Sequence, residues 1–323
     1  MPLDSAQLES VPERYCSPFL SDGWVHQKYL GWKLVADRPG LRVLNKRYGP
    51  FERYLMLLTA GGKAALEETV KRSVGQLGRF DIFIHDFEGV LEGQPPCLAG
   101  HVFARVERGE RLLNIATYVV DLAQSKDDLW KGLNATARKM VRKAEKSGAV
   151  FHSTVSNPEV IDAFYRLYLP MARTNRLAIP NRADIDNMSK GGDLRCTYCT
   201  DKNGRIGIVQ LLYFCENIAI PMYGAGGKDM TGTGQFVQWN NLLLAQQLGC
   251  RWYDLGGVSD PDRLDGIHLF KKSIGGAFVS LGVEYRCRGT LFYIASHLRA
   301  AKLWWRSRSL LRRKQFELGT SNE

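Results

Sequence analysis

Long apolar runs are missing from this chain of 323 residues. A membrane-spanning helix needs about 18 consecutive apolar residues, and no window provides them. The best candidate, residues 206–223, is interrupted by Gln210, Glu216 and Asn217. The first thirty residues also lack the apolar stretch of a secretory signal peptide. These absences predict a soluble, cytoplasmic protein that folds in a reducing compartment.

Cysteine and histidine are too scattered to predict a disulfide framework or a metal centre. The seven cysteines are an odd number in a long chain, which argues against a fully paired secreted scaffold. Cys196 and Cys199 form a single Cys-x-x-Cys pair, and on a strand this odd spacing sends the two side chains to opposite faces. The six histidines show no ligand spacing, and no Gly-x-Ser-x-Gly elbow is present. We therefore expect no metal and no bound cofactor, and a serine hydrolase is disfavoured.

Positive charge, by contrast, is concentrated in two segments. The net charge is +11; residues 131–148 hold six cations and one anion, and residues 286–323 hold nine cations and two anions. Two local basic surfaces favour a polyanionic partner such as RNA, an anionic lipid surface or a phosphorylated substrate. Each segment alone is equally consistent with a solvated helix face. The candidate tRNA- or phosphate-binding cations are Arg138, Lys139, Arg142, Lys143, Arg306, Arg312 and Arg313.

Apolar runs and helical patterns alternate along the chain, which is typical of an α/β protein. Ser125 is the expected N-cap of one helix that runs to Gly148, with a basic stripe at every fourth residue away from its apolar face. Pro170 is expected to kink or end a second helix over 158–176. The remaining expected elements are strands at 54–58, 80–84, 112–120, 195–200, 206–214, 218–223 and 252–255, and helices at 63–77 and 235–248.

This order predicts two tandem domains, each a mixed central sheet flanked by helices, with a boundary near residue 150. The domains are expected at 1–150 and 151–290, followed by a basic amphipathic C-terminal helix and tail at 291–323. In that tail, Trp304 and Trp305 stand among arginines, as in a helix that lies at a membrane interface. Peripheral contact with an anionic membrane at the inner face, through residues 291–314, is one interpretation. A helix packed on the body with a basic outer face is the other.

A glycine-rich segment, residues 224–234, lies between an expected strand and an expected helix. Glycines let the backbone approach a ligand, and free amides at a helix start favour phosphate, so Gly232 and Gly234 are candidate phosphate contacts. Acyl-CoA N-acetyltransferases (the GNAT superfamily) use such a loop for the CoA pyrophosphate. Asp229 stands where their pattern has Gln or Arg, and its charge opposes phosphate. A plain tight turn fits equally well.

The most specific segment is YDLGGVSDPDRLDGIHLFKKSIGGAFVSLGVEY, residues 253–285. Asp254 and a double glycine end a strand, and Phe270-Lys271-Lys272 precedes a second double glycine. This arrangement resembles the C-terminal signature of the Fem family, aminoacyl-tRNA-dependent ligases that add amino acids to peptidoglycan precursors. Ile274 and Val283 are mild departures from that signature. Further resemblances follow in the family's order at Trp24, Lys28 and Trp32, at residues 47–50, 83–86, 134–148 and 164–176, and at 223–224 and 238–240.

The resemblance implies two tandem GNAT-like domains that form an amide bond between an aminoacyl group and an amine. Lys271 is implied as the cation beside the aminoacyl carbonyl, the Phe270 carbonyl as a group that orients the attacking amine, and Asp86 as its binder or base. Lys272 is implied to contact phosphate. The implied substrate-binding residues are Lys28, Arg173, Arg176, Tyr223, Trp239, Asn240, Asp254, Gly256 and Gly257.

Structural alternatives stand beside these roles. Lys271 and Lys272 fit a surface pair, Asp254 fits a turn cap, Asp86 fits a solvated strand end, and Lys28 fits a side chain that only packs along apolar surface.

At the level of function, the expected activity is an aminoacyl-tRNA-dependent aminoacyltransferase acting on a peptidoglycan precursor or a natural-product amine. The alternatives are an acyl-CoA- or acyl-carrier-dependent N-acyltransferase and a non-catalytic tRNA- or membrane-binding module.

Overall fold

The computed structural model describes residues 15–22, 31–74, 78–107, 109–155, 157–175, 177, 179–190, 192–227, 232–258 and 265–298. The chain forms two compact units, and each is assembled from separate stretches of sequence. Unit 1 comprises Met1–Lys33 and Glu107–Gly282, and unit 2 comprises Leu34–Val106 and Val283–Glu323. The chain therefore begins in unit 1, forms most of unit 2, returns to complete unit 1, and then adds the last stretch of unit 2.

Unit 1 is built on a seven-stranded mixed sheet in the order β14-β8-β13-β12-β11-β10-β9. Neighbouring strands are antiparallel except β12 and β13, which are parallel and joined by a helix. The strands are β8 Ala116–Asp121, β9 Val150–Thr154, β10 Leu194–Thr200, β11 Ile206–Cys215, β12 Ile218–Gly226, β13 Trp252–Gly257 and β14 Ala277–Ser280.

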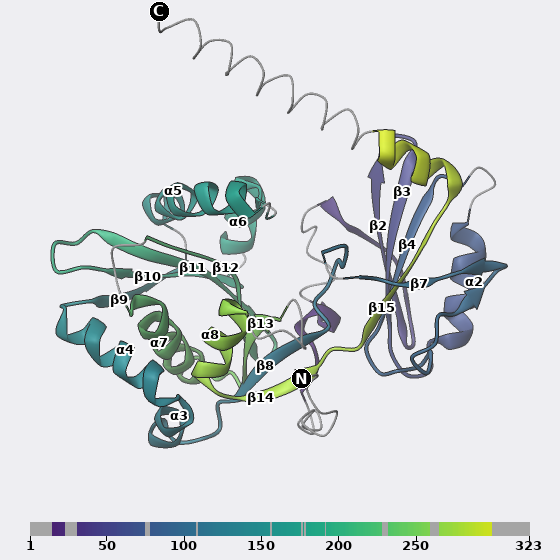
Figure 1. Ribbon diagram of the computed structural model, residues 1–323. Coiled ribbons are helices and arrows are strands. Elements are labelled where there is room, and N and C mark those ends of the chain that lie inside the picture. Colours follow the sequence, from purple (N-terminus) through teal and green to yellow (C-terminus); the bar gives the residue numbers. More distant parts are fainter. Residues whose placement is uncertain are drawn as a thin grey trace, which may run out of the picture. The chain divides into compact units, whose positions relative to one another are not determined.

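Helices cover both faces of this sheet (Figure 1). On one face lie α5 Pro158–Asn175 and α6 Arg182–Lys190, and on the other lie α3 Lys126–Gly132, α4 Ala135–Lys146, α7 Thr233–Gln247 and α8 Gly266–Ile274. A short 3-10 helix, η2 Pro18–Leu20, precedes them in the chain. Cys196 and Cys199 lie in the cores of opposite faces, as their spacing predicts.

One helix prediction needs correction, and one of the two outcomes expected at Pro170 does not occur. The single helix expected over 125–148 is two helices, because Leu133 is extended and Asn134 caps α4 by accepting a hydrogen bond from the Ala137 amide at 2.8 Å. Pro170 does not end α5, which continues through it to Asn175. The apolar side chains of α5 pack on β11 and β12, so burial outweighs the one backbone bond that proline removes.

Unit 2 is built on a six-stranded mixed sheet in the order β1-β2-β3-β4-β15-β7. Helix α2 Lys63–Ser73 connects the parallel strands β3 and β4 and buries Leu66 and Val70 against one face. The strands are β1 Lys33–Arg38, β2 Leu41–Tyr48, β3 Phe51–Leu58, β4 Phe80–Asp86, β7 Ala104–Arg105 and β15 Val283–Arg288, with a separate hairpin of β5 Cys97–Leu98 and β6 His101–Val102. Residues 290–298 are helical, and the rest of the expected basic tail lies outside the described residues.

The boundary expected near residue 150 falls between α4 and β9, both of which belong to unit 1. The reason is strand pairing: β8 lies between β13 and β14, which brings the stretch before residue 150 into the same sheet as the stretch after it. Two mixed sheets flanked by helices nevertheless confirm the expected α/β class. Among the described residues, no helix is long and apolar enough to span a bilayer.

Candidate active site at the end of strand β13

Lys271 is held at the carboxyl end of β13. It lies in the last turn of α8, a helix that starts where Asp265 accepts a hydrogen bond from the His268 amide. Its ammonium donates to the carbonyl oxygens of Gly256 and Gly257, both at 2.7 Å. Lys272, the next residue, is exposed. The surface pair that was the alternative interpretation therefore separates into one anchored lysine and one solvated lysine.

The glycines are required because of how β13 ends. Strands β12 and β13 pair only at Ile218–Trp252 and Ala219–Tyr253, and beyond these residues the two strands no longer hydrogen-bond. Gly256 has φ of +77°, which favours glycine, and a Cβ on Gly257 would lie 1.9 Å from the Asn114 side chain. The double glycine thus forms an irregularity in the pairing with β8, between Asp254 and Gly257, and turns two carbonyl groups toward Lys271.

Asp254 stabilises this turn through hydrogen bonds to its carboxylate. Its carboxylate is 1% exposed and accepts hydrogen bonds from the Tyr15 hydroxyl at 2.5 Å, from the Gly256 amide at 2.7 Å and from the Thr117 hydroxyl. The Thr117 oxygen also lies 2.8 Å from the Gly256 carbonyl oxygen. Burial raises the pKa of Asp254, although the three donors and the charge of Lys271 act in the opposite direction. The turn-cap interpretation of Asp254 agrees with this geometry, and the cap lies directly beneath the lysine.

Burial also lowers the pKa of Lys271 to about 8, and the negative charges of Asp254 and Asp265 oppose that shift. An ammonium group has three N–H donors, and two of them are used by the glycine carbonyls. The third forms no hydrogen bond within the described residues. A fixed cation of this kind stabilises an oxyanion that develops at an acyl carbon.

Phe270 and the two loop glycines pack together. A Cβ on Gly234 would lie 3.4 Å from the Phe270 ring, and one on Gly232 would lie 2.7 Å from the Met140 carbonyl oxygen of α4. These glycines therefore let the start of α7 pack closely on α4 and α8, as in a tight turn. Gly232 is the N-cap of α7 and supplies no side-chain bond to its first amides. The Phe270 carbonyl already accepts the Ser273 hydroxyl at 2.6 Å.

The other substrate-binding candidates of unit 1 are not assembled around Lys271. Tyr223 packs on Phe164 and Tyr168 in the core beneath α5, and its burial raises its pKa to about 12. Trp239 is buried against Trp130, and Asn240 donates to its own helix. Arg173 is exposed in the last turn of α5.

Asp86 lies in unit 2, at the end of β4, and is 1% exposed. Its two carboxylate oxygens accept hydrogen bonds from the amides of Val90 and Leu91, at 2.9 and 2.8 Å. The structure thus gives Asp86 a loop-capping role, whereas the sequence alternative was a solvated strand end. Five further candidates fall outside the described residues: Lys28, Arg176, Arg306, Arg312 and Arg313.

Helix α4 presents the expected basic face. Lys139, Arg142 and Lys143 are exposed, and within the described chain none of them forms an ion pair. Arg142 lies over the Trp130 ring at 5.5 Å, and Arg138 folds back onto the carbonyls of Lys131 and Leu133. Ion pairs among the described residues therefore do not neutralise the charge of this face.

Sequence reasoning missed two members of the site, Tyr15 and Thr117. Tyr15 lies 239 positions from Asp254 in the chain, and it packs edge-on against Trp252. Neither residue stands in a motif, and no local pattern marks them. Only the pairing of β8 with β13 and the return of the N-terminal segment bring both hydroxyls to one carboxylate.

Comparison with solved structures shows what this fold is similar to. FemX matches with a TM-score of 0.61 and 16% identity, over 86% of this chain and 93% of FemX. The L-PGS structure from Bacillus licheniformis matches with a TM-score of 0.55 and 12% identity, over 87% of this chain and 91% of that one. A C-terminal domain from Agrobacterium fabrum, provisionally named lysylphosphatidylglycerol synthetase, matches with a TM-score of 0.55 and 11% identity, over 82% and 87%.

Sequence comparisons add nothing to these structural likenesses: no protein-family model matches the chain, and no curated protein matches it. At such identities the likeness concerns the fold alone. The Fem-like fold that the sequence motifs predict is confirmed by the structural likeness to FemX over most of both chains.

Proposed function

We propose that this protein is an N-acyltransferase that moves an aminoacyl group from aminoacyl-tRNA to an amine. The observation that carries the proposal is the anchored ammonium of Lys271, held by the carbonyls of Gly256 and Gly257 with one N–H to spare. A lysine serving only solubility would have no need of two backbone acceptors and a buried carboxylate beneath it. The FemX-like fold supports the same reaction class.

The chemistry needs little more than positioning and one cation. The neutral amine attacks the ester carbonyl carbon, a C–N bond forms, and the carbonyl oxygen becomes an oxyanion that the third N–H of Lys271 receives. Collapse of this intermediate breaks the ester C–O bond, and the ribose oxygen of the tRNA leaves with the proton that the amine gives up. Lys271 acts in its charged form, so the glycine carbonyls and Asp254 serve to keep it protonated and aimed.

The basic face of α4 supports tRNA as the donor. Its exposed cations lie along one helix side, as expected for contact with a phosphate backbone. The names of the similar proteins point to two acceptor classes, a peptidoglycan precursor for FemX by family resemblance and phosphatidylglycerol for the synthetases. In both, the aminoacyl carbonyl is the reacting centre, so Lys271 has the same task. We take an amine as the acceptor.

A second donor, acyl-CoA or an acyl carrier, is favoured by one observation. Helix α7 begins at Gly232 with no side-chain hydrogen bond to cap it, and an uncapped helix N-terminus favours phosphate. The close approach of Gly232 to α4 explains the same glycine by packing alone. CoA therefore ranks second.

The deciding experiment is a transfer assay with the full chain. Bulk radiolabelled aminoacyl-tRNA and labelled acetyl-CoA are offered in parallel with a cytosolic amine pool, to wild type, Lys271→Met and Lys272→Met. We expect RNase-sensitive transfer that Lys271→Met reduces by about 100- to 1,000-fold, the cost of losing one oxyanion donor. Lys272→Met, the adjacent solvated lysine, keeps the activity.

Each other result has a defined meaning. Transfer from acetyl-CoA alone would mean that the protein is a CoA-dependent N-acyltransferase. Transfer that Lys271→Met leaves intact removes Lys271 from the mechanism. Absence of transfer together with tight tRNA binding by both variants favours a non-catalytic RNA-binding module.

A further inference from the structure

Residues 290–298 form a helix on unit 2 that the proposed reaction does not use (Figure 1). Its first turn is tied to the start of β4. The Phe292 amide donates to the Gly78 carbonyl at 3.0 Å, and the Gly289 amide donates to the Phe80 carbonyl at 2.9 Å. A Cβ on Gly289 would lie 2.4 Å from the Gly78 carbonyl oxygen, so the chain enters the helix in close contact with β4. The helix therefore starts at a fixed place on unit 2.

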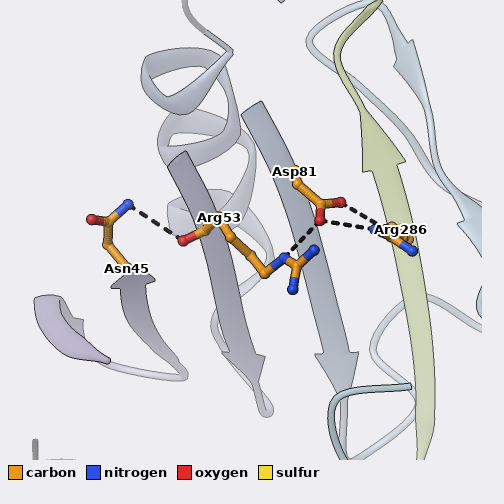
Figure 2. Close-up of polar contacts among 4 residues, drawn as sticks. All are labelled: Asn45, Arg53, Asp81 and Arg286. Carbon is orange, nitrogen blue, oxygen red and sulfur yellow. Dashed lines mark hydrogen bonds and ion pairs between the residues drawn. The ribbon is translucent and has the colours of Figure 1, made fainter. Parts of the chain in front are cut away.

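Phe292 is the side chain that packs this helix on unit 2. It is 8% exposed, and its ring meets the Phe51 ring edge-on with centroids 5.6 Å apart. The guanidinium of Arg53 lies 5.6 Å from the Phe292 ring centre. Arg53 is itself fixed, because its Nε donates at 2.7 Å to the buried carboxylate of Asp81, which also accepts from Arg286 (Figure 2). One side of the helix is thus held against the strands.

A different side of the same helix carries a row of exposed apolar residues. Leu291, Ile294 and Leu298 keep 39, 48 and 67% of their surface exposed. Residues three and four positions apart lie on one helix face, so these three side chains form a single row that does not include Phe292. We call Leu291, Ile294 and Leu298 the apolar stripe.

Large apolar side chains that are exposed elsewhere in unit 2 are isolated. Among the described residues of this unit they are Val35 of β1, Val102 of β6 and, on the helix itself, Tyr293, whose ring contacts the His297 ring. Single exposed apolar side chains are ordinary on a protein surface. A row of them on one helix face instead indicates a surface for an apolar partner.

The sequence that follows the stripe is strongly basic. Residues 299–314 hold seven cations and no anion, and Arg299 and Lys302 come one and four positions after Leu298. An apolar row next to cations matches an anionic lipid surface, where apolar side chains enter the acyl boundary and cations stay with the phosphates. RNA would leave an aliphatic stripe without contacts, because bases stack on aromatic rings. A second copy of the chain would bring two segments of like charge together.

We propose that the apolar stripe and the cations that follow it dock unit 2 on an anionic lipid surface. A helix this short is marginal in isolation, but the contacts of Phe292 fix it before it meets the lipid, which lowers the entropic cost of binding. The same helix therefore packs on the body through one side and binds lipid through another. The proposal does not depend on the proposed function, because lipid binding requires no transfer and Lys271 lies in unit 1.

Flotation of the full chain with vesicles tests the apolar stripe. We expect binding to vesicles that contain phosphatidylglycerol and little binding to pure phosphatidylcholine. Leu298→Asp should weaken binding about tenfold or more, because the most exposed residue of the stripe no longer enters the acyl boundary. Val102→Asp is the matched control: this apolar residue of unit 2 is 70% exposed, lies outside the stripe and should leave binding unchanged.

Salt separates the apolar contribution from the charged one. Arg299→Gln combined with Lys302→Gln should weaken binding about tenfold at low salt, and this loss should fade at high salt. The loss caused by Leu298→Asp should remain at high salt. Lys139→Gln combined with Lys143→Gln, on the exposed face of α4, is the matched charge control and should leave vesicle binding unchanged.

Four results would overturn the proposal. They are no binding to phosphatidylglycerol vesicles, binding that Leu298→Asp leaves intact, equal weakening by the α4 control, which would mean diffuse charge, and a dimer in place of vesicle binding. A dimer would appear in analytical sedimentation as a concentration-dependent species that Leu298→Asp dissociates, and it would assign the stripe to a second copy. If Leu298→Asp does not fold, Leu298→Ser decides the matter by a several-fold loss or by none.

Discussion

The buried carboxylates of Asp254 and Asp81 satisfy their oxygens in opposite ways. Asp254 in unit 1 is bound by two hydroxyls and an amide, all neutral, and the nearby charge is the single ammonium of Lys271. Asp81 in unit 2 is bound by two guanidinium groups. One carboxylate is therefore held by neutral donors, whereas the other is held by charged donors.

This difference teaches what each carboxylate does. Neutral donors hold Asp254 in place without competing for its charge, so its field acts on Lys271 and raises the pKa of that lysine. Guanidinium donors consume the charge of Asp81, so it serves to lock Arg53 and Arg286 in position. The first arrangement changes the pKa of a lysine, and the second fixes the positions of two guanidinium groups.

The largest expected effect is a loss of stability when the buried carboxylate of unit 2 is removed. Asp81→Asn removes the buried carboxylate charge that binds Arg53 and Arg286, and should lower the free energy of unfolding by about 3–5 kcal/mol. Asp254→Asn should cost less, because its amide oxygen still accepts the Gly256 amide and its donors are neutral. Urea unfolding of both variants measures the difference. Equal costs would mean that donor charge does not distinguish the two carboxylates.

The next effect concerns the hydroxyl that reaches Asp254 from the N-terminal segment. Tyr15→Phe removes the donor at 2.5 Å and leaves one buried carboxylate oxygen without it, which should cost about 1.5–3 kcal/mol. Tyr293→Phe, at an exposed tyrosine of the 290–298 helix, should stay within about 0.5 kcal/mol. Chemical denaturation of both variants checks this. A neutral Tyr15→Phe would show that Thr117 and Gly256 suffice.

The strand end offers a smaller, local test. Gly256→Ala places a side chain at φ of +77° and within 3.4 Å of the Lys271 ammonium and the Pro221 carbonyl oxygen. The left-handed backbone alone costs about 1–2 kcal/mol, and transfer activity should fall more than stability because the Lys271 acceptors move. Gly266→Ala at the start of α8, where a Cβ meets open space, is the matched control and should be silent in both measurements.

The sequence indicated the residues of the site that lie near the end of β13, but not the distant residues that hold them in place. A strand, a double glycine and Phe270-Lys271-Lys272 are close in sequence, and the family resemblance implied Lys271 as the cation of the site. Asp254 could be placed there too, but its partner Tyr15 is 239 positions away and belongs to no pattern. Long-range hydroxyl donors leave no local signal, because any tyrosine or threonine in the right fold can supply them.

The boundaries of the two units and the break between α3 and α4 were not predicted, for related reasons. Apolar spacing continues from Leu129 through Leu133 to Ala137, so periodicity favoured one helix, while the break depends on Asn134 capping α4. The division into units depends on β15 pairing with β4, nearly 200 positions earlier in the chain. Alternation of strands and helices predicted the fold class, but it contains no information on which distant strands pair.

The smallest expected effect is the sharpest test of the comparison, a shift in pH dependence. The pKa of Lys271 is about 8, below its ordinary value, so its ammonium is present below pH 8 and is lost as pH rises through that value. If the ammonium stabilises the oxyanion, kcat/KM measured against pH has a falling limb near 8. A lysine acting as a base would give a rising limb instead. The two roles therefore differ in sign.

Asp254→Asn then tests whether the position of the falling limb in the kcat/KM profile depends on the Asp254 carboxylate. The charge of Asp254 raises the pKa of Lys271, so its removal should move the falling limb to lower pH. Asp81→Asn in unit 2 should lower stability without moving the limb. A limb that stays in place in Asp254→Asn would mean that Asp254 carries a proton at that pH. It would then support the Gly256 turn by hydrogen bonds alone, and the contrast between the two carboxylates would reduce to geometry.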